Sequence, residues 1–485
     1  MTARVAVIGG GLAGLAAAVR LVERGVNVEL FESRGRLGGR AGSFHDRDSA
    51  AWVDHCQHVG MGCCHRLLAL CATIGRPEFF RRDRCLWFVD PLGRVFPFHG
   101  QRGWPAPLHL APAFVGLGFL GWRERWSIAR ALLALAYLPH SPELDDTSVA
   151  QWLRRRGMSD LAIRRFWSVV LVSALSETLE GISLAAARKV FVDGFLSTND
   201  AYELLIPAFP LDELSESIGA WLEARGARIH RGATVQRLVG DAQSVTGIVV
   251  DGAAGETLHP VTKVVVAVPW HRVPSLARTA AFAAKLEPMF QRLEQFEPAA
   301  ITSVHVWFDR PLMAYPHAVL VDRLSHWVFR HDLASVAAQT AAPPTSHAEH
   351  YYQAVISATH RDAPRSGDDW TAEVLADLRA VFPAAREARL LRSRVVTQPR
   401  AVFRPRPGLG RHRPLAGTPV AGLVLAGDWI DTGWPATMEG AIRGGELAAH
   451  AVAPVESAEN SRFPRGIREF LFGGNPQSSG SPVRR

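Results

Sequence analysis

The stretch that decides the fold is Arg4-Val5-Ala6-Val7-Ile8-Gly9-Gly10-Gly11-Leu12-Ala13-Gly14. Residues 4–8 are apolar and rich in β-branched side chains, which predicts a buried parallel strand. Residues 15–23 are rich in Ala and Leu without a helix breaker, which predicts a helix. Residues 26–31 form a second predicted strand that closes in Glu32. This order of strand, glycine turn, helix, strand and acid is typical of a dinucleotide-binding βαβ unit.

Each glycine of this unit has its own expected role. Gly9 permits the tight turn, Gly11 lets the backbone approach a pyrophosphate, and Gly14 lets helix and strand pack closely. The phosphates would face the free N–H groups at the helix N-terminus, around Leu12 and Ala13. The alternative is a purely structural βαβ unit with an incidental glycine run, and the surrounding pattern makes that alternative the weaker one.

The second predicted strand continues into Glu32-Ser33-Arg34-Gly35-Arg36-Leu37-Gly38-Gly39-Arg40. Glu32 is expected to accept a hydrogen bond from a ribose hydroxyl. The pair Gly38-Gly39, flanked by Arg36 and Arg40, offers a second backbone surface with cations, which suits a diphosphate. A solvated basic turn is the alternative, and it fits Arg34 better than the two arginines beside the glycines.

This E-x-x-x-R-x-G-G-R string resembles the flavin amine oxidase and phytoene desaturase superfamily. The resemblance implies FAD rather than NAD as the cofactor. It also implies an α/β fold: a Rossmann-type FAD-binding domain with an inserted substrate domain of mixed sheet and helical cap. The length of 485 residues suits two or three domains or one large bilobal enzyme.

The net charge of +8 is concentrated in one region of the chain. Residues 81–165 hold 13 Arg, no Lys and 7 acidic residues, and therefore carry +6 of the +8. Five of the 14 Trp lie there too. A positive, Trp-bearing region suits an anionic membrane surface or an anionic ligand. Nucleic acid is the other interpretation, but no nucleic-acid motif accompanies the charge, so no nucleic-acid partner is expected.

The five cysteines all fall between Cys56 and Cys85. An odd number does not suggest a disulfide framework. Histidines lie among them, but the spacing lacks a paired C-x-x-C, and the adjacent Cys63-Cys64 is awkward for tetrahedral ligation. We therefore expect buried free thiols and no metal. The sequence enters a strand without an apolar leader, which favours a cytoplasmic protein.

The segment Asp54-His55-Cys56-Gln57-His58 follows the glycine–arginine turn. It resembles the D-N-G-Q-H segment of hydroxysqualene dehydroxylases, with His55-Cys56 in place of that family's Asn-Gly. In the superfamily this stretch passes beside the isoalloxazine ring. The alternative is a polar loop whose histidine caps a neighbouring element.

The middle of the chain predicts a helical cap with an interfacial character. Residues 105–121 are apolar but broken by Pro and Gly, too short to span a bilayer. Trp122-Arg123-Glu124-Arg125-Trp126 follows, and then a predicted apolar helix over residues 128–138. Trp and Arg beside apolar surface are typical of an interfacial anchor. An internal helix pair is the alternative. We expect a peripheral protein on the inner face of the membrane.

The C-terminal signature is a strand ending in Gly427-Asp428 and a helix that starts at Thr437-Met438-Glu439. The resemblance implies that Asp428 binds the ribityl or phosphate portion of the flavin, and that the backbone of Val235 contacts the adenine. The positive helix end would stabilise a reduced, anionic flavin. The expected division is FAD-binding parts at 1–95, 206–290 and 399–453, a helical cap at 96–205, a substrate-domain sheet at 291–398 and a flexible tail at 454–485.

The resemblance implies a reaction: reduction of hydroxysqualene to squalene on the route to hopanoids or related triterpenes. Such a reaction needs an acid, a long apolar pocket and exclusion of water. Asp54, His58 and Glu439 are the candidate acids, in that order. The expected partners are a lipid-like isoprenoid substrate, a membrane surface and the preceding isoprenoid synthase. The alternatives are a carotenoid-type desaturase and an amine oxidase; the latter would need a Lys-associated water, and Lys is scarce here.

Overall fold

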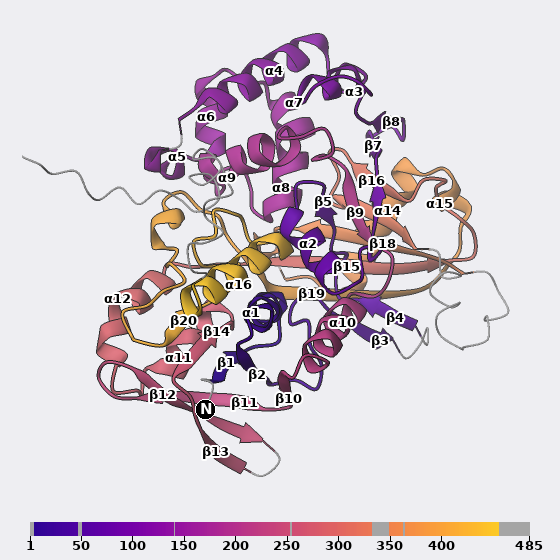
Figure 1. Cartoon of the computed structure of the whole chain (residues 1–485). Coiled ribbons are helices and arrows are strands. Elements are labelled where there is room, and N and C mark those ends of the chain that lie inside the picture. The colour runs from indigo at the N-terminus through magenta and orange to yellow at the C-terminus, as the bar shows by residue number, and fades with distance from the viewer. Residues whose placement is uncertain are drawn as a thin grey trace, which may run out of the picture.

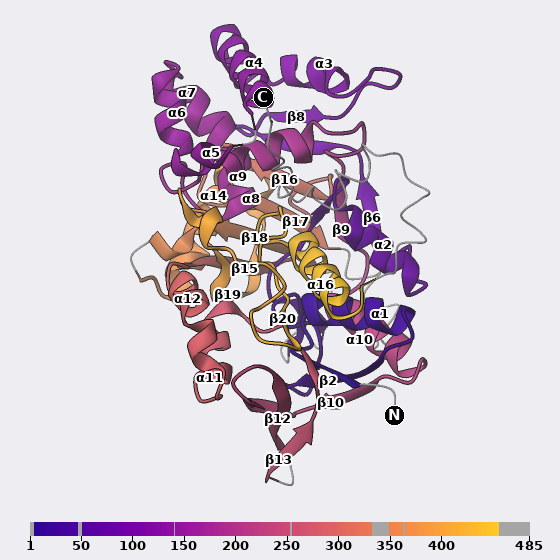
Figure 2. The same cartoon turned by 60° about the vertical axis from the view of Figure 1, so that its left-hand side comes forward.

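A computed structural model describes residues 4–46, 51–139, 141–252, 255–331, 349–361 and 364–454. Within these ranges the chain forms a nucleotide-binding half and a substrate half, with a layer of helices over the latter (Figures 1 and 2). The expected flexible tail lies outside the described residues from residue 455 onward.

The nucleotide-binding half is built on a five-stranded parallel sheet in the order β10-β2-β1-β14-β20. Its strands come from three distant parts of the chain: β1 (Arg4–Ile8), β2 (Asn27–Glu32), β10 (Arg228–Arg231), β14 (Lys263–Val266) and β20 (Leu423–Leu425). This confirms the expected Rossmann-type α/β fold. Apolar strand residues are buried on both faces, as parallel sheets require.

Helices and a small sheet cover the two faces of this parallel sheet. On one face lie α1 (Leu12–Glu23), α10 (Leu211–Glu223) and α16 (Met438–Val452). On the other lie β11 (Thr234–Gly240), β12 (Val245–Gly252), β13 (Gly255–Pro260), α11 (Val273–Ala277) and α12 (Ala283–Leu293). Gly445 lets α16 approach α1, because a Cβ there would lie 2.2 Å from the Ala13 carbonyl oxygen.

The substrate half is built on a seven-stranded sheet in the order β19-β15-β18-β17-β16-β7-β8. The strands are β7 (Leu86–Val89), β8 (Val95–Phe98), β15 (Pro298–Phe308), β16 (His317–Leu320), β17 (Trp327–His331), β18 (His350–Ser357) and β19 (Leu390–Phe403). The expected boundary at residue 95 falls inside the β7–β8 hairpin, and this hairpin pairs with β16. Residues 86–98 therefore belong to the substrate sheet, because Phe88 pairs with Val319, 231 positions later in the chain. The helices α14 (Gly367–Val381) and α15 (Ala384–Glu387) pack against the sheet.

A layer of helices forms the cap at the end of the molecule opposite β13 (Figures 1 and 2). It comprises α3 (Ala111–Val115), α4 (Trp122–Tyr137), α5 (Pro142–Asp146), α6 (Val149–Arg155), α7 (Asp160–Ala162), α8 (Val169–Leu175) and α9 (Leu184–Arg188). Helix α4 starts at Trp122, six residues before the predicted start, because Gly121 supplies its N-cap and residues 122–127 lack a breaker. No helix among the described residues has both the length and the apolar character needed to cross a membrane.

Short elements connect the two halves. The hairpin of β3 (Ser43–Asp46) and β4 (Ala51–Asp54) leads into the Asp54–His58 segment. A three-stranded sheet follows, of β5 (Gly60–Met61), β9 (Leu204–Pro207) and β6 (Phe80–Asp83), with α2 (His65–Thr73) between β5 and β6. The Asp54–His58 segment is thereby held between the parallel sheet and the substrate sheet.

Candidate active site

A cavity of about 750 Å³ lies where the three chain parts of the parallel sheet meet. Nearly all the residues expected to bind the cofactor line it. These are Gly9, Gly11, Leu12, Ala13, Glu32, Arg36, Gly38, Gly39, Arg40, Val235, Gly427, Asp428, Thr437 and Met438. Segments more than 400 residues apart thus form one site.

The glycine turn has the geometry that its sequence predicts. Gly9 has a φ of +107°, which a residue with a side chain rarely adopts. A Cβ on Gly14 would lie 1.9 Å from the Gly9 carbonyl oxygen, so Gly14 does not line the cavity but lets α1 pack under the turn. At Gly11 the nearest atom to such a Cβ is the Gly39 Cα at 4.0 Å. That position faces open space and can admit a ligand.

Glu32 at the end of β2 is buried and supports the turn. Its Oε2 accepts a hydrogen bond from the Gly10 N–H at 2.7 Å, and its Oε1 accepts one from the Arg34 N–H at 2.9 Å. The carboxylate also borders the cavity. One oxygen therefore fixes the glycine turn and the other fixes the backbone after β2, while the residue borders the cavity.

Two arginines join the N-terminal part of the chain to distant parts. The Arg40 Nη2 donates to both carboxylate oxygens of Asp428 at 2.7 Å, and its Nη1 donates to the Ala401 carbonyl at 2.8 Å. The Arg36 guanidinium donates to Asp212 at 3.1 Å and to the His55 Nε2 at 3.4 Å. Both guanidinium groups remain on the cavity wall, where they favour an anionic ligand.

The C-terminal helix α16 points its N-terminus at the cavity. Thr437 is its N-cap and accepts a hydrogen bond from the Gly440 N–H at 3.0 Å. Gly444 lets the helix pack beneath Gly427, because a Cβ there would lie 2.3 Å from the Gly427 carbonyl oxygen. Thr437 and Met438 line the cavity, so the positive end of the helix faces it.

These features fit FAD. The open space at Gly11, the N-terminus of α1 and the nearby arginines suit a diphosphate. Val235, buried at the start of β11, and Glu32 border the part of the cavity beyond the diphosphate site. The fold and site together define a flavin-dependent oxidoreductase.

The comparisons with known proteins agree with this class. The chain belongs to the flavin containing amine oxidoreductase family, whose model matches residues 12–453. It is 26% identical to a 15-cis-phytoene desaturase of Synechococcus elongatus over 470 residues, 93% of this chain and 95% of the relative. It is 25% identical to a zeta-carotene desaturase of Synechocystis over 481 residues, 93% of this chain and 97% of the relative. The expected FAD cofactor is confirmed.

Solved structures show the same fold. A putrescine oxidase matches with a TM-score of 0.68 at 16% identity, covering 93% of this chain and 99% of that one. An oxidoreductase from Methanosarcina mazei matches with a TM-score of 0.66 at 19% identity, covering 91% and 99%. At these identities the likeness concerns the fold alone.

Asp54, the first candidate acid, lies behind the cavity wall. Its Oδ1 accepts hydrogen bonds from the Ser43 hydroxyl at 2.6 Å and the Leu211 N–H at 3.1 Å. Burial raises the pKa of this carboxyl to about 6, against the two hydrogen bonds, which lower it. The side chain is not part of the cavity lining. No sequence motif points to Ser43 as a partner of Asp54, so this contact could not be predicted.

His58, the second candidate, lines the cavity together with His55. The His58 Nδ1 lies 2.8 Å from the Cys56 carbonyl oxygen, which can only accept, so Nδ1 carries the proton. Its Nε2 makes no hydrogen bond within the part of the chain that the structure describes. Burial lowers the pKa of His58, and burial also lowers that of His55. His58 is therefore a mostly neutral imidazole with an available Nε2.

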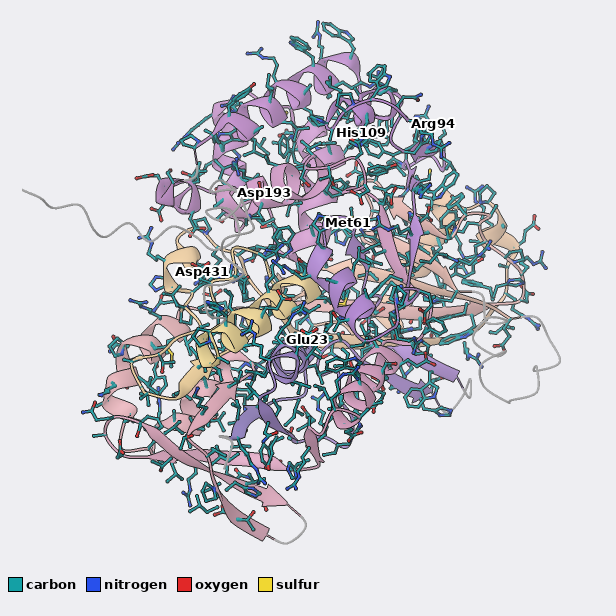
Figure 3. All side chains as sticks on the ribbon, viewed as in Figure 1. Glu23, Met61, Arg94, His109, Asp193 and Asp431 are labelled. Atoms are coloured by element: carbon teal, nitrogen blue, oxygen red, sulfur yellow. The ribbon has the colours of Figure 1, made fainter. Side chains whose placement is uncertain are left out.

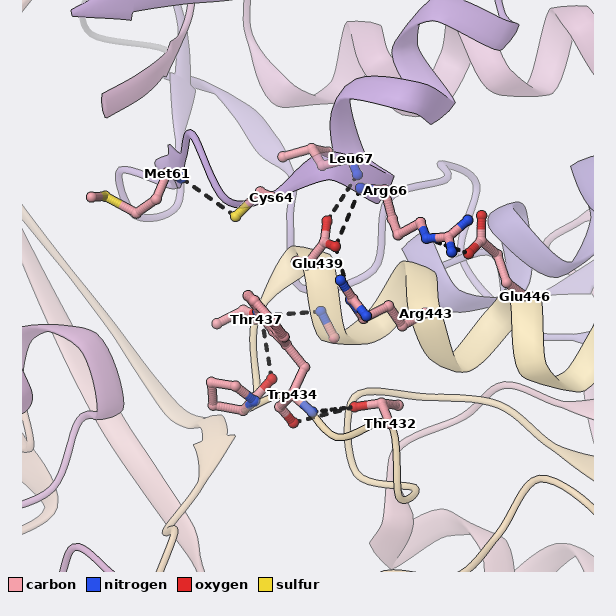
Figure 4. Close-up of polar contacts among 12 residues, drawn as sticks. Met61, Cys64, Arg66, Leu67, Thr432, Trp434, Thr437, Glu439, Arg443 and Glu446 are labelled. Atoms are coloured by element: carbon pink, nitrogen blue, oxygen red, sulfur yellow. Dashed lines mark hydrogen bonds and ion pairs between the residues drawn. The ribbon is translucent and has the colours of Figure 1, made fainter. Parts of the chain in front are cut away.

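Glu439, the third candidate, is fully buried in α16 and holds two helices together (Figure 4). It accepts hydrogen bonds from the N–H groups of Arg66 at 3.2 Å and Leu67 at 2.9 Å, at the start of α2. The Arg443 Nε donates to the same carboxylate at 2.8 Å. Glu439 is outside the cavity lining. These contacts give Glu439 a structural role, and its role as an acid stays a prediction.

Two residues without a sequence motif also shape the site. His271 follows β14 and lines the cavity beside Arg272. Arg413 donates to the Asp428 carbonyl at 2.9 Å and to the Ile430 carbonyl, and thereby fixes the loop before α16. The proximity of Arg413 to this loop arises from folding, so sequence spacing could not identify it. Among the described residues no group of three or more His, Cys, Asp or Glu side chains could hold a metal, and all five cysteines are free thiols.

Proposed function

We propose that this flavoprotein acts on a long apolar isoprenoid, and that its reaction is the reductive dehydroxylation of hydroxysqualene to squalene. The observation that carries the proposal is the placement of the Asp54–His58 segment. His55 and His58 face the cofactor cavity, while Cys56, between them, belongs to an apolar cluster on the other side. An imidazole thus stands where a cofactor cavity and an apolar region meet.

The apolar cluster around Cys56 suits a hydrocarbon chain. It combines side chains of the substrate sheet, of β9 and of the cap: Leu86, Leu204, Ile206, Phe329 and Val355, with Val59, Met61, Phe88, Phe98, Phe195, Ile301 and Trp327 packed against them. Burial in this cluster raises the pKa of the Cys56 thiol to about 12. Such surroundings exclude water, which protects a carbocation from capture.

In this proposal His58 donates a proton to the allylic hydroxyl of the substrate. Hydroxide is a poor leaving group, so protonation of the allylic hydroxyl must accompany cleavage of the C–O bond and departure of water. The His58 Nε2 is the available atom on the cavity wall, and its Nδ1–H remains anchored to the Cys56 carbonyl. Reduced FAD held in the cavity would supply the hydride to the substrate carbon and would be left as oxidised FAD. Asp54 acts as a positioning residue, since it ties the segment to Ser43 and α10.

The second candidate is desaturation of a carotenoid precursor. The similarity to phytoene and zeta-carotene desaturases over more than 90% of the chain favours it. Here the neutral His58 would accept a proton from the substrate. An amine oxidase fits less well, because the three lysines, Lys189, Lys263 and Lys285, do not line the cavity.

Product analysis decides between the two. Pre-reduced holoenzyme with hydroxysqualene under anaerobic conditions is expected to form squalene and reoxidise the flavin in a single turnover. In the parallel reaction, oxidised holoenzyme is incubated with phytoene and a quinone acceptor, and desaturated phytoene is measured. Desaturated phytoene without squalene formation would overturn the proposal in favour of the second candidate.

The pH dependence gives an independent test of His58. For dehydroxylation the protonated imidazole is needed, so the single-turnover rate falls as pH rises through the lowered pKa of His58. For desaturation the neutral form is needed, and the rate rises with pH instead. His58→Gln is expected to keep FAD but lose about 10²–10⁴-fold in rate. If the profile persists in this variant and disappears in Asp54→Asn, Asp54 is the acid.

A further inference from the structure

Helix α4 is apolar on two opposite faces. Ile128, Ala131 and Leu135 are buried in the core of the cap. On the outer side Trp122, Trp126, Leu133 and Tyr137 are 71%, 63%, 59% and 81% exposed. Their spacings of four, seven and four residues place them along one stripe of the helix. Figure 3 shows side chains that project from α4 away from the rest of the molecule.

Three more exposed apolar side chains lie in the segments just before α4. Trp104, Leu108 and Val115 are 48%, 57% and 61% exposed, and α3 lies beside α4 in both views (Figures 1 and 2). These seven residues, here called the α4 patch, are half of the fourteen large apolar side chains exposed in the described residues. An exposed apolar patch of this kind is typical of an interaction surface.

Arginines without ion-pair partners in the described residues accompany the α4 patch along the chain. Residues 100–140 contain four arginines and a single acidic residue, Glu124. Arg102, Arg123 and Arg130 are exposed and form no ion pair within the described residues. The Glu124 carboxylate accepts a hydrogen bond from the Ser159 hydroxyl at 3.4 Å. The Arg123 guanidinium lies 5.8 Å from the centroid of the Trp122 ring. Indole and phenol rings beside guanidinium groups without an acidic partner suit an interface that is apolar inside and anionic at its surface.

We propose that the α4 patch is a membrane-docking surface, which inserts its Trp, Leu and Tyr side chains into the interface of an anionic bilayer. A second copy of this chain fits less well, since a symmetric contact would bring Arg123 and Arg130 close to their counterparts. An amphipathic surface helix lies in the plane of the interface, and its binding grows with apolar area and with anionic lipid.

The inner face of α4 leads toward the candidate active site. Phe88, Phe98 and Trp327 pack against the core of the cap and also against the apolar cluster around Cys56. These shared side chains connect the core of the cap with the apolar cluster around Cys56. If the proposed isoprenoid function holds, these side chains would form an apolar wall between the docked surface and the cofactor cavity.

The first test measures binding of the FAD-loaded protein to sedimented vesicles, without any substrate. Vesicles of phosphatidylcholine with phosphatidylglycerol are expected to bind the wild type. The double variant Trp122→Ser with Trp126→Ser is expected to bind about a hundredfold more weakly, from about tenfold for each lost side chain. Leu258→Ser with Leu415→Ser is the matched control, because both leucines are exposed outside the patch.

The second test addresses charge. Arg123→Glu with Arg130→Glu is expected to weaken binding to the anionic vesicles by about a hundredfold, and high salt to weaken the wild type. Arg225→Glu with Arg237→Glu has the same net charge, lies in the nucleotide-binding half and serves as the control. Equal binding of patch and control variants would overturn the proposal. So would a wild-type dimer that the Trp variant dissociates while vesicle binding stays unchanged.

A third measurement separates docking from the proposed function. If both hold, the Trp double variant loses turnover of hydroxysqualene carried in vesicles but keeps turnover of hydroxysqualene in detergent. Vesicle binding without any turnover by the wild type would contradict the proposed function and leave the docking surface intact.

Discussion

The cofactor cavity and the helical cap are held together by different kinds of contact. In the cavity, glycines bring backbone against backbone: Gly14 under Gly9, Gly444 under Gly427 and Gly445 against Ala13. In the cap, apolar side chains interlock, with Trp167 fully buried and Phe166 stacked on Phe191. A backbone contact tolerates no added atom, whereas side-chain packing tolerates many combinations of similar volume. The cavity therefore requires glycine at particular positions, whereas the cap requires only apolar side chains of suitable total volume.

Substitution of the glycines gives the largest expected effect. Gly14→Val places a branched side chain where even a Cβ would overlap the Gly9 carbonyl, so we expect a loss of about 3 kcal/mol or more in unfolding free energy. Gly11→Val has open space and should leave the apoprotein stable while abolishing FAD binding. Urea unfolding and flavin content measure the two effects. Equal destabilisation by both variants would contradict the different roles assigned to these glycines.

Substitution of Glu439 tests whether this buried carboxylate stabilises the fold. Glu439→Ala leaves the Arg443 guanidinium and two N–H groups of α2 without their acceptor, at an expected cost of about 3 kcal/mol in unfolding free energy. Thermal unfolding measures the loss. The folded fraction should keep the wild-type single-turnover rate. A stable variant with a slow chemical step would instead identify Glu439 as the acid.

The carboxyl group of Asp54 makes the unfolding free energy depend on pH. Its folded-state pKa of about 6 lies above the ordinary value of 3.8. The protonated form is therefore favoured by folding, and this stability is lost as pH rises through about 6. Over the whole range the loss is at most about 3 kcal/mol. Asp54→Asn should gain stability relative to wild type between pH 4.5 and pH 7, as measured by urea unfolding. A pH-independent difference would contradict the raised pKa.

The smallest expected effect comes from the outer face of α4. Trp126→Ser should change the unfolding free energy by less than about 0.5 kcal/mol, because its side chain is exposed. Ile128→Ala, two residues away but fully buried, should cost about 2–4 kcal/mol. Chemical denaturation of both variants shows which face of the helix contributes to the unfolding free energy. A large loss from Trp126→Ser would show that the outer face is packed.

The sequence by itself determined the parallel sheet, the FAD site and most of its lining. Roles could be assigned to Gly9, Gly11, Gly14 and Glu32 because the backbone geometry of one βαβ unit and its phosphate site require these residue types. Their spacing fixes the strand–turn–helix geometry without reference to the rest of the chain. Local sequence spacing likewise identified Gly427, after β20, and Thr437, at the start of α16.

Only the tertiary structure decided what the buried acids and the apolar helices do. Asp54 meets Leu211 across 157 positions, and Glu439 meets Leu67 across 372. No local pattern encodes such partners. Composition also cannot distinguish the inner and outer faces of α4, because both are apolar. Burial is set by what packs against a side chain, and those neighbours come from elsewhere in the chain.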